Sequence, residues 1–114
     1  MSRIEKNYAH NLQLATSAVD VVQAVPDAVT SVISKLSFYN SSSTTARLVT
    51  IHAVENGGTA DTGNTIARRS VAPLTAWSVI EVINERLSQG MKLQATQDAG
   101  TDVNANCSGA DFTQ

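Results

Sequence analysis

The segment Val29–Asn40 reads VTSVISKLSFYN, the next five residues, Ser41–Thr45, read SSSTT, and Ala46–Val54 reads ARLVTIHAV. A β-strand points successive side chains to opposite faces of its sheet, so a strand with one buried face alternates apolar and polar residues. Two alternating runs around a short polar segment therefore predict two strands, each with one apolar face, with a turn between them.

The alternation assigns the residues of the first run to two faces. Val32, Leu36 and Phe38 share one parity, and we expect that row to face the core of the domain. Ile33 and Tyr39 share the other parity, which is too apolar for a face that meets only water. We therefore predict that this second row contacts a neighbouring subunit.

The remainder of the chain repeats this pattern in shorter segments. About eight short strands separated by turn signals predict an all-β fold, a two-sheet antiparallel sandwich of jelly-roll or Ig-like type. The N-terminal residues 1–11 are polar without a clear period and are expected to form an extended arm, with a single sandwich domain at 12–114. Besides the two runs above, strands are expected at Leu12–Thr16, Val19–Val25, Thr65–Val71, Ala76–Val82, Met91–Thr96 and Val103–Cys107, and a polar tail with Phe112 as a possible anchor at Ser108–Gln114.

The segment 76–88 fits two periodicities. Trp77 and Val79 alternate as in a strand, whereas Ile80, Ile83 and Leu87 follow a helical spacing that ends near Gly90. We expect a strand over residues 76–82 and a short helical turn over residues 83–88.

Composition excludes several function classes. The 114 residues carry a net charge of −2, so the chain lacks the excess of Lys and Arg typical of nucleic-acid binding. No apolar run reaches the length of about 20 residues that a membrane helix needs. Charged residues make up only 16% of the chain, which suggests that part of the surface contacts other subunits rather than water.

The single cysteine, Cys107, excludes an internal disulfide. The first residues, MSRIEKNYAHN, lack the apolar stretch of a signal peptide. We therefore expect synthesis and folding in a reducing cytosol.

One triplet, Asp61-Thr62-Gly63, matches the active-site signature of aspartic proteases, whose dimeric members share a proton between two such carboxylates. Here the triplet follows Gly57-Gly58-Thr59-Ala60 and no later hydrophobic-hydrophobic-Gly segment accompanies it. Because Asp and Gly are common turn residues, we interpret the triplet as a turn.

No other segment indicates catalysis or a cofactor. His10 and His52 lack the spacing of metal ligands, and no glycine-rich loop opens a helix, so we expect no metal and no cofactor. We interpret Cys107 as a small half-buried residue and Trp77 as a core residue. The chain is not expected to be an enzyme.

The sequence resembles the small virion proteins of tailed bacteriophages in the style and order of its segments. The resemblance rests on LSFYN followed by a polar turn and RLVTIHAV, then on LSQGMKLQA and the closing VNANCSGADF. It implies a β-sandwich or jelly-roll subunit of the head-decoration or cement type that forms homo-oligomers, dimers or trimers. It also implies a place on the outer surface of the capsid, after synthesis in the host cytoplasm.

The partners implied by the resemblance are the major coat protein or another virion protein, with no nucleic acid and no membrane. The expected subunit or coat contacts are Arg3, Tyr8 and His10 of the arm, together with Ile33 and Tyr39. Alternatives within this interpretation are a tail, baseplate or tail-fibre component, or a β-module that binds a host receptor or carbohydrate, which would need an exposed aromatic platform.

Overall fold

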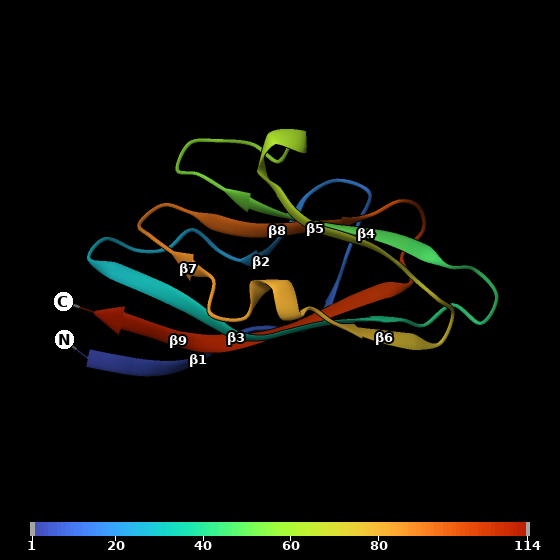
Figure 1. The fold of residues 1–114 in the computed structure, drawn as a ribbon, viewed down its shortest axis with the longest axis horizontal. Helices are drawn as coiled ribbons and strands as arrows, with labels where there is room; N and C mark the ends of the chain where they lie inside the picture. Colours follow the sequence, from blue (N-terminus) through green and yellow to red (C-terminus); the bar gives the residue numbers. More distant parts are fainter. Residues whose placement is uncertain (1, 114) are drawn as a thin grey trace.

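The computed structural model describes residues 2–113, whose strands form two antiparallel sheets packed face to face (Figure 1). This confirms the predicted all-β, two-sheet antiparallel sandwich. The strands are β1 (Ser2–Gln13), β2 (Val19–Val22), β3 (Val29–Asn40), β4 (Arg47–Val54), β5 (Thr65–Val71), β6 (Thr75–Ser78), β7 (Arg86–Leu87), β8 (Lys92–Gln97) and β9 (Val103–Thr113). Two single turns of 3-10 helix, η1 (Thr62–Asn64) and η2 (Ile80–Val82), interrupt the connections, and no helix within residues 2–113 is long and apolar enough to cross a membrane.

The order of the strands is that of a jelly roll. One sheet has the order β1-β9-β3-β6, with the short β7 also paired to β3, and the other has the order β2-β8-β4-β5. The chain changes sheet at every connection except β4 to β5 and β6 to β7, so each sheet is assembled from segments far apart in sequence. Of the two predicted topologies, the jelly roll is therefore the one observed.

A β-bulge in β3 changes which side chains face the core. Ile33 pairs with Gly109 and Lys35 with Ser108, so Ser34 is an extra residue with no Cα opposite it on β9. A Cβ at position 109 would overlap the carbonyl oxygen of Val32, so the close approach of the two strands there requires glycine.

This bulge corrects the predicted outward face of Ile33. Ile33 is fully buried, because the inserted residue puts it on the same face as Leu36 and Phe38, whereas Val32 points outward. The prediction that Ile33 contacts a neighbouring subunit is therefore wrong, and the prediction that Val32 faces the core is wrong for the same reason. Leu36 and Phe38 are buried as predicted.

The apolar core lies between the sheets and is centred on β3. Phe38 is fully buried and packs on Trp77 of β6, with ring centroids 5.8 Å apart. The prediction that Trp77 is a core residue is confirmed. Four further leucine and isoleucine side chains are fully buried in the same core. They are Leu14 after β1, Ile51 on β4, Leu87 on β7 and Leu93 on β8.

The segment 76–88 differs from its prediction. The strand ends at Ser78, and the helical turn lies at Ile80–Val82 rather than at residues 83–88. Asn84 has a φ of 69°, a left-handed conformation that stops a helix, and its amide donates to the carbonyl of Ile33. The chain then pairs with the outer edge of β3 through β7.

β1 begins and β9 ends on the same side of the molecule (Figure 1). Residues 2–11, expected as an extended arm, are extended and lie in β1, which pairs with β9 from Ser2 opposite Thr113 to Gln13 opposite Asn104. The predicted polar tail after Ser108 is instead the second half of β9, because β1 and β3 pair with it on both sides through Thr113. Gln114 lies outside the described residues.

Candidate functional site

Asp61-Thr62-Gly63 forms a capped turn, as the sequence indicates. The Asp61 carboxylate accepts hydrogen bonds from the amides of Gly63 and Asn64, at 2.8 and 3.2 Å. In return the Asn64 side-chain oxygen accepts from the amide of Asp61 at 3.0 Å, which completes a capping box. The carboxylate is therefore engaged by its own turn in an exposed loop, and the turn prediction is confirmed.

His52 connects this loop to β4 through hydrogen bonds. Its Nδ1 lies 3.0 Å from the carbonyl oxygen of Asp61 and 3.0 Å from the side-chain oxygen of Asn64, and the residue is buried on β4. Among residues 2–113, no three His, Cys, Asp or Glu side chains gather closely enough to hold a metal ion. The environment of His52 is explained by its hydrogen bonds to the loop.

Cys107 is buried more deeply than the sequence suggests. It lies on β9 between Ala9 of β1 and Leu36 of β3, and only 1% of its surface is exposed. Burial raises the pKa of the Cys107 thiol to about 12. Since the thiolate is the reactive form, this thiol is inert at neutral pH.

The structure brings three of the five predicted contact residues to one surface, the outer face of the β1-β9-β3 sheet. Arg3 forms an ion pair with Glu5 on the same strand and lies over the ring of Phe112, 5.9 Å from its centroid. Tyr39 is 42% exposed on the same face of β3, and His10 is exposed on β1. Because each of these side chains leaves the sheet on the side away from the core, they form a shared surface.

The middle of this outer face is polar but carries little charge. A shallow hollow of about 350 Å³ lies there, and most of the residues that line it are small amides and hydroxyls with one lysine. They are Asn7, His10, Lys35, Ser37, Asn106, Cys107 and Ser108. Such a face offers hydrogen-bond donors and acceptors to a partner without strong electrostatic attraction.

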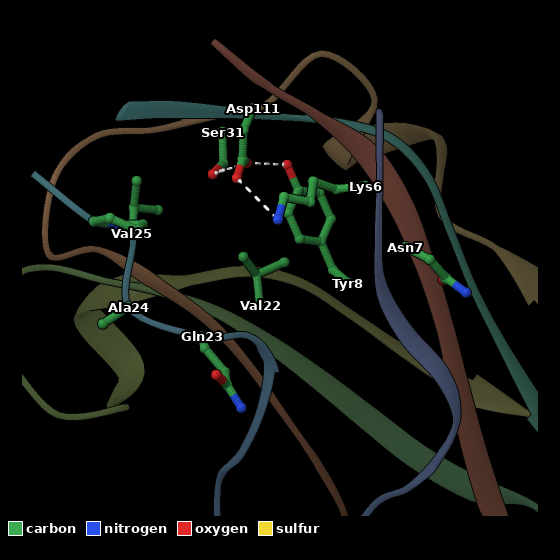
Figure 2. A pocket seen from close by; sticks show the side chains of 10 residues that line it. Lys6, Asn7, Tyr8, Val22, Gln23, Ala24, Val25, Ser31 and Asp111 are labelled. Atoms are coloured by element: carbon green, nitrogen blue, oxygen red, sulfur yellow. Dashed lines mark hydrogen bonds and ion pairs between the residues drawn. The ribbon is translucent and has the colours of Figure 1, made fainter. Parts of the chain in front are cut away.

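The remaining two predicted contact residues, Tyr8 and Ile33, point inward. Figure 2 shows Lys6, Tyr8 and Ser31 converging on Asp111 at one end of the sandwich. The hydroxyls of Tyr8 and Ser31 each donate to Asp111 Oδ1 at 2.7 Å, and Lys6 Nζ lies 4.0 Å from Oδ2. Asp111, which lies within the predicted polar tail, is thus the centre of a polar cluster that joins three strands.

The chemistry of this cluster is that of a structural contact. Burial, and then the hydrogen bond to the Asp111 carboxylate, raise the pKa of Tyr8, so its hydroxyl stays protonated and donates at neutral pH. The hollow beside it, about 260 Å³ and partly lined by Val22 and Val25, is open to solvent. The alternation of Val103, Ala105 and Cys107, continued along the chain, was the one sequence signal that could have placed Asp111 on the inner face.

The aromatic side chains do not form a platform for a sugar. Trp77 is buried and its Nε1 has no hydrogen-bond partner, Tyr8 points inward, and Tyr39 is the one exposed residue of the three. A carbohydrate-binding surface made of these three residues, as that alternative requires, is therefore not present.

Comparison with known proteins gives a likeness in fold. No protein-family model matches the chain, and no curated protein matches its sequence. Among solved structures, a protein of the Bacillus endospore appendages, described as a family of disulfide-linked pili, matches with a TM-score of 0.57 and 14% identity over 98% of this chain and 88% of that one. A capsid protein of the infectious bursal disease virus particle matches 96% of this chain and 30% of its own, with 17% identity and a TM-score of 0.44.

The likeness to the pilus protein concerns the fold alone and does not show the role of the chain. The pilus protein shares the sandwich over nearly the whole length of both chains, at an identity that supports common fold alone. The chain spans under a third of the capsid protein, and that TM-score is too low to support any conclusion.

Proposed function

We propose that this protein is a non-enzymatic structural subunit of an extracellular or virion assembly. The observation that carries the proposal is the jelly roll itself, shared with a pilus protein along 98% of this chain and 88% of that one. The candidate chemistry of the sequence supports it, since the Asp61 carboxylate caps its own turn and the Cys107 thiol is buried.

Within this class we propose a capsid decoration or cement protein of a tailed bacteriophage, as the resemblance of the sequence implies. Jelly rolls are a common architecture of viral shell proteins. A cement protein binds the assembled shell and not its free subunits, so it stabilises the shell by mass action. The proposed role needs one broad adhesive surface and no reaction centre.

The outer face of the β1-β9-β3 sheet is the surface that we assign to the coat. Arg3, His10 and Tyr39 lie on it, around the amide- and hydroxyl-lined hollow. A low-charge face of this kind suits a partner surface that is itself fixed in a lattice, because the subunit does not need long-range attraction to find it.

A fibre subunit is the second candidate, and the pilus protein is the specific observation that favours it. That family is described as disulfide-linked. In this chain the single cysteine is buried between two strands, so a fibre of these subunits is held together without disulfides.

Immunogold electron microscopy on particles and fibres from the producing cells tests both candidates. Gold on tailed-phage heads supports the cement protein, gold along fibres supports the second candidate, and gold on tails indicates a tail component. Gold on none of these, with the protein abundant and free, contradicts a structural role.

A matched pair of variants tests the assigned face. Tyr39→Ala should lower occupancy on the labelled assembly, whereas Ile80→Ala, at an exposed site in η2, should leave it unchanged. Both variants should melt like the parent protein. Equal occupancy of the two variants means that the outer face of the β1-β9-β3 sheet is not the contact.

A further inference from the structure

The first half of β1 is an unpaired sheet edge. β1 ends the order of its sheet and pairs on one side only, with β9. Residues Ser2–Asn7 pair with β9 in unbroken register, and all six are exposed. The register shifts that follow, between Asn7 and Ala9 and between Ala9 and Leu12, bend the second half. Backbone amides and carbonyls along the first half are therefore free to pair with another strand.

The other edges of the sandwich are less suited to pairing. β2 and β6 are four residues long, and β7 is two. β5 has seven residues, but its pairing with β4 contains a register shift and its exposed Arg68 and Arg69 repel a second copy of the same edge. Short length and charged side chains are two ways in which proteins prevent edges from associating. The first half of β1 is longer than β2, β6 or β7, and its charged residues, Arg3, Glu5 and Lys6, are of both signs, so they can pair with those of a second copy. It also exposes one large apolar side chain, Ile4, by 49%.

Symmetry limits how two copies of this edge can meet. Two identical antiparallel edges are related by a two-fold axis perpendicular to the sheet, so outer-face residues meet outer-face residues. The residue on the axis then faces its own copy. If the axis passes through a charged residue, namely Arg3, Glu5 or Lys6, that residue faces a like charge in the other copy, which is destabilising. If the axis passes through Ile4, the two Ile4 side chains face each other. Arg3 of each copy then lies opposite Glu5 of the other copy, so the symmetry forms this pair twice.

We propose that two copies of this protein associate through β1 in this register, with the two-fold axis at Ile4. The two β1-β9-β3-β6 sheets become one continuous sheet, and the ion pair that Arg3 forms with Glu5 within each copy gains a cross-strand partner in the other copy. The inference goes beyond the proposed function and does not depend on it, because either a cement protein or a fibre subunit can use such a contact.

The contact is small. Five paired residues on each side, Ser2–Lys6, cover less surface than the roughly 1,200 Å² at the lower end of stable interfaces. The dimer is therefore weak in dilute solution and gains occupancy where an assembly holds subunits close together. A covalent trap is the suitable test, since it accumulates a weakly populated state.

Disulfide trapping of single cysteine variants tests the register. Antiparallel partners have Cα atoms about 4.5–5.5 Å apart, within the range that a disulfide spans. Under mild oxidation Ile4→Cys should form a disulfide-linked dimer at least about tenfold faster than Arg3→Cys or Glu5→Cys alone, because only residue 4 meets itself. A mixture of Arg3→Cys and Glu5→Cys should yield the mixed dimer. The buried Cys107 does not interfere.

Equal cross-linking of all three variants, or no cross-linking of Ile4→Cys, overturns the proposal. Sedimentation at high protein concentration adds a matched comparison. Ile4→Lys, which puts like charges on the axis, should weaken self-association at least about tenfold, and Ile80→Lys, at a 73% exposed site away from the edge, should not. Loss of self-association in Ile80→Lys with none in Ile4→Lys also overturns it, because the contact then lies at η2.

Discussion

β1 and β3 are matched in length and differ in almost everything else. Each has 12 residues, and each pairs with a different side of β9. β3 has neighbours on both sides and buries Phe38, Leu36 and Ile33, whereas the first six residues of β1 are all exposed. Both strands pair with β9, so their difference in burial comes from their positions in the sheet and from their side chains.

The comparison separates residues that stabilise the fold from residues whose backbone groups are available to a partner. A central strand such as β3 contributes to folding because one of its faces packs in the core and both of its edges are paired, so a change there affects many contacts. An edge strand with exposed side chains contributes little to the fold and leaves its backbone groups free for a partner. We therefore expect the effects of substitutions to decrease from β3 to the first half of β1.

The largest effect is expected at Phe38. Phe38→Ala removes a fully buried ring that packs on Trp77 and should lower the free energy of unfolding by about 3–5 kcal/mol. Denaturant unfolding measures the loss. Tyr39→Ala, one residue further along β3 and 42% exposed, is the control and should change stability by no more than about 1 kcal/mol. Similar losses in the two variants would mean that β3 does not have the two faces described.

The next effect is expected at Asn40, at the end of β3. Its side-chain nitrogen donates to the carbonyls of Thr45 and Val71 at 2.9 and 3.0 Å, and its oxygen accepts from the amide of Ser42. Asn40→Ala leaves these groups unpaired in a buried site and should cost about 1–3 kcal/mol.

Thermal melting measures the effect of this change. Asn104→Ala, on the outer face of β9, is the matched control and should melt close to the parent protein. If the two asparagine variants melt alike, Asn40 does not organise the turn that follows β3.

A smaller, pH-dependent effect is expected at Tyr8, where β1 turns inward. Tyr8→Phe removes a hydrogen bond to the Asp111 carboxylate and should cost about 1–2 kcal/mol near pH 8. The pKa of Tyr8 is raised by folding, so above about pH 10 the unfolded chain loses its proton first and the parent protein loses stability. The advantage of the parent over Tyr8→Phe should therefore shrink as the pH rises past 10.

Unfolding at a series of alkaline pH values measures this change. The ionisation of Cys107 is common to both proteins and cancels in the difference. Tyr39→Phe serves as the control, because Tyr39 is exposed on the outer face. An advantage that stays constant with pH would contradict the role given to the Tyr8 hydroxyl.

The smallest effect is expected at Ile4. Ile4→Ala should change the unfolding free energy of the isolated protein by no more than about 0.5 kcal/mol, because the side chain is half exposed at an edge. Dilute denaturant titration, where the monomer predominates, measures it. A loss above about 1 kcal/mol would place the start of β1 in the stable part of the fold.

Sequence reasoning succeeded where the determining interactions are local. The alternation of Leu36 and Phe38 and the polar turn after Asn40 predicted β3, β4 and a sandwich. The capped turn at Asp61 was predicted because Asp and Gly favour turns wherever they occur.

The errors at Ile33 and Asp111 involve residues that are distant in sequence. Ile33 was assigned to the wrong face because the bulge at Ser34 depends on its pairing with Gly109 on another strand. Asp111 was missed because the hydroxyls that bind it come from Tyr8 and Ser31, on two other strands. The choice of jelly roll over Ig-like topology likewise depends on which sheet each strand joins, and strand periodicity contains no information on that.

The bulge at Ser34 also determines where the length of β3 can change. No residue of β9 lies opposite Ser34 in the register, so deleting Ser34 would leave each remaining residue opposite its present partner and on its present face. A one-residue deletion or insertion elsewhere in the strand would turn over every side chain on one side of it. Natural or engineered variants of this protein that differ in length by one residue within β3 should therefore differ at Ser34.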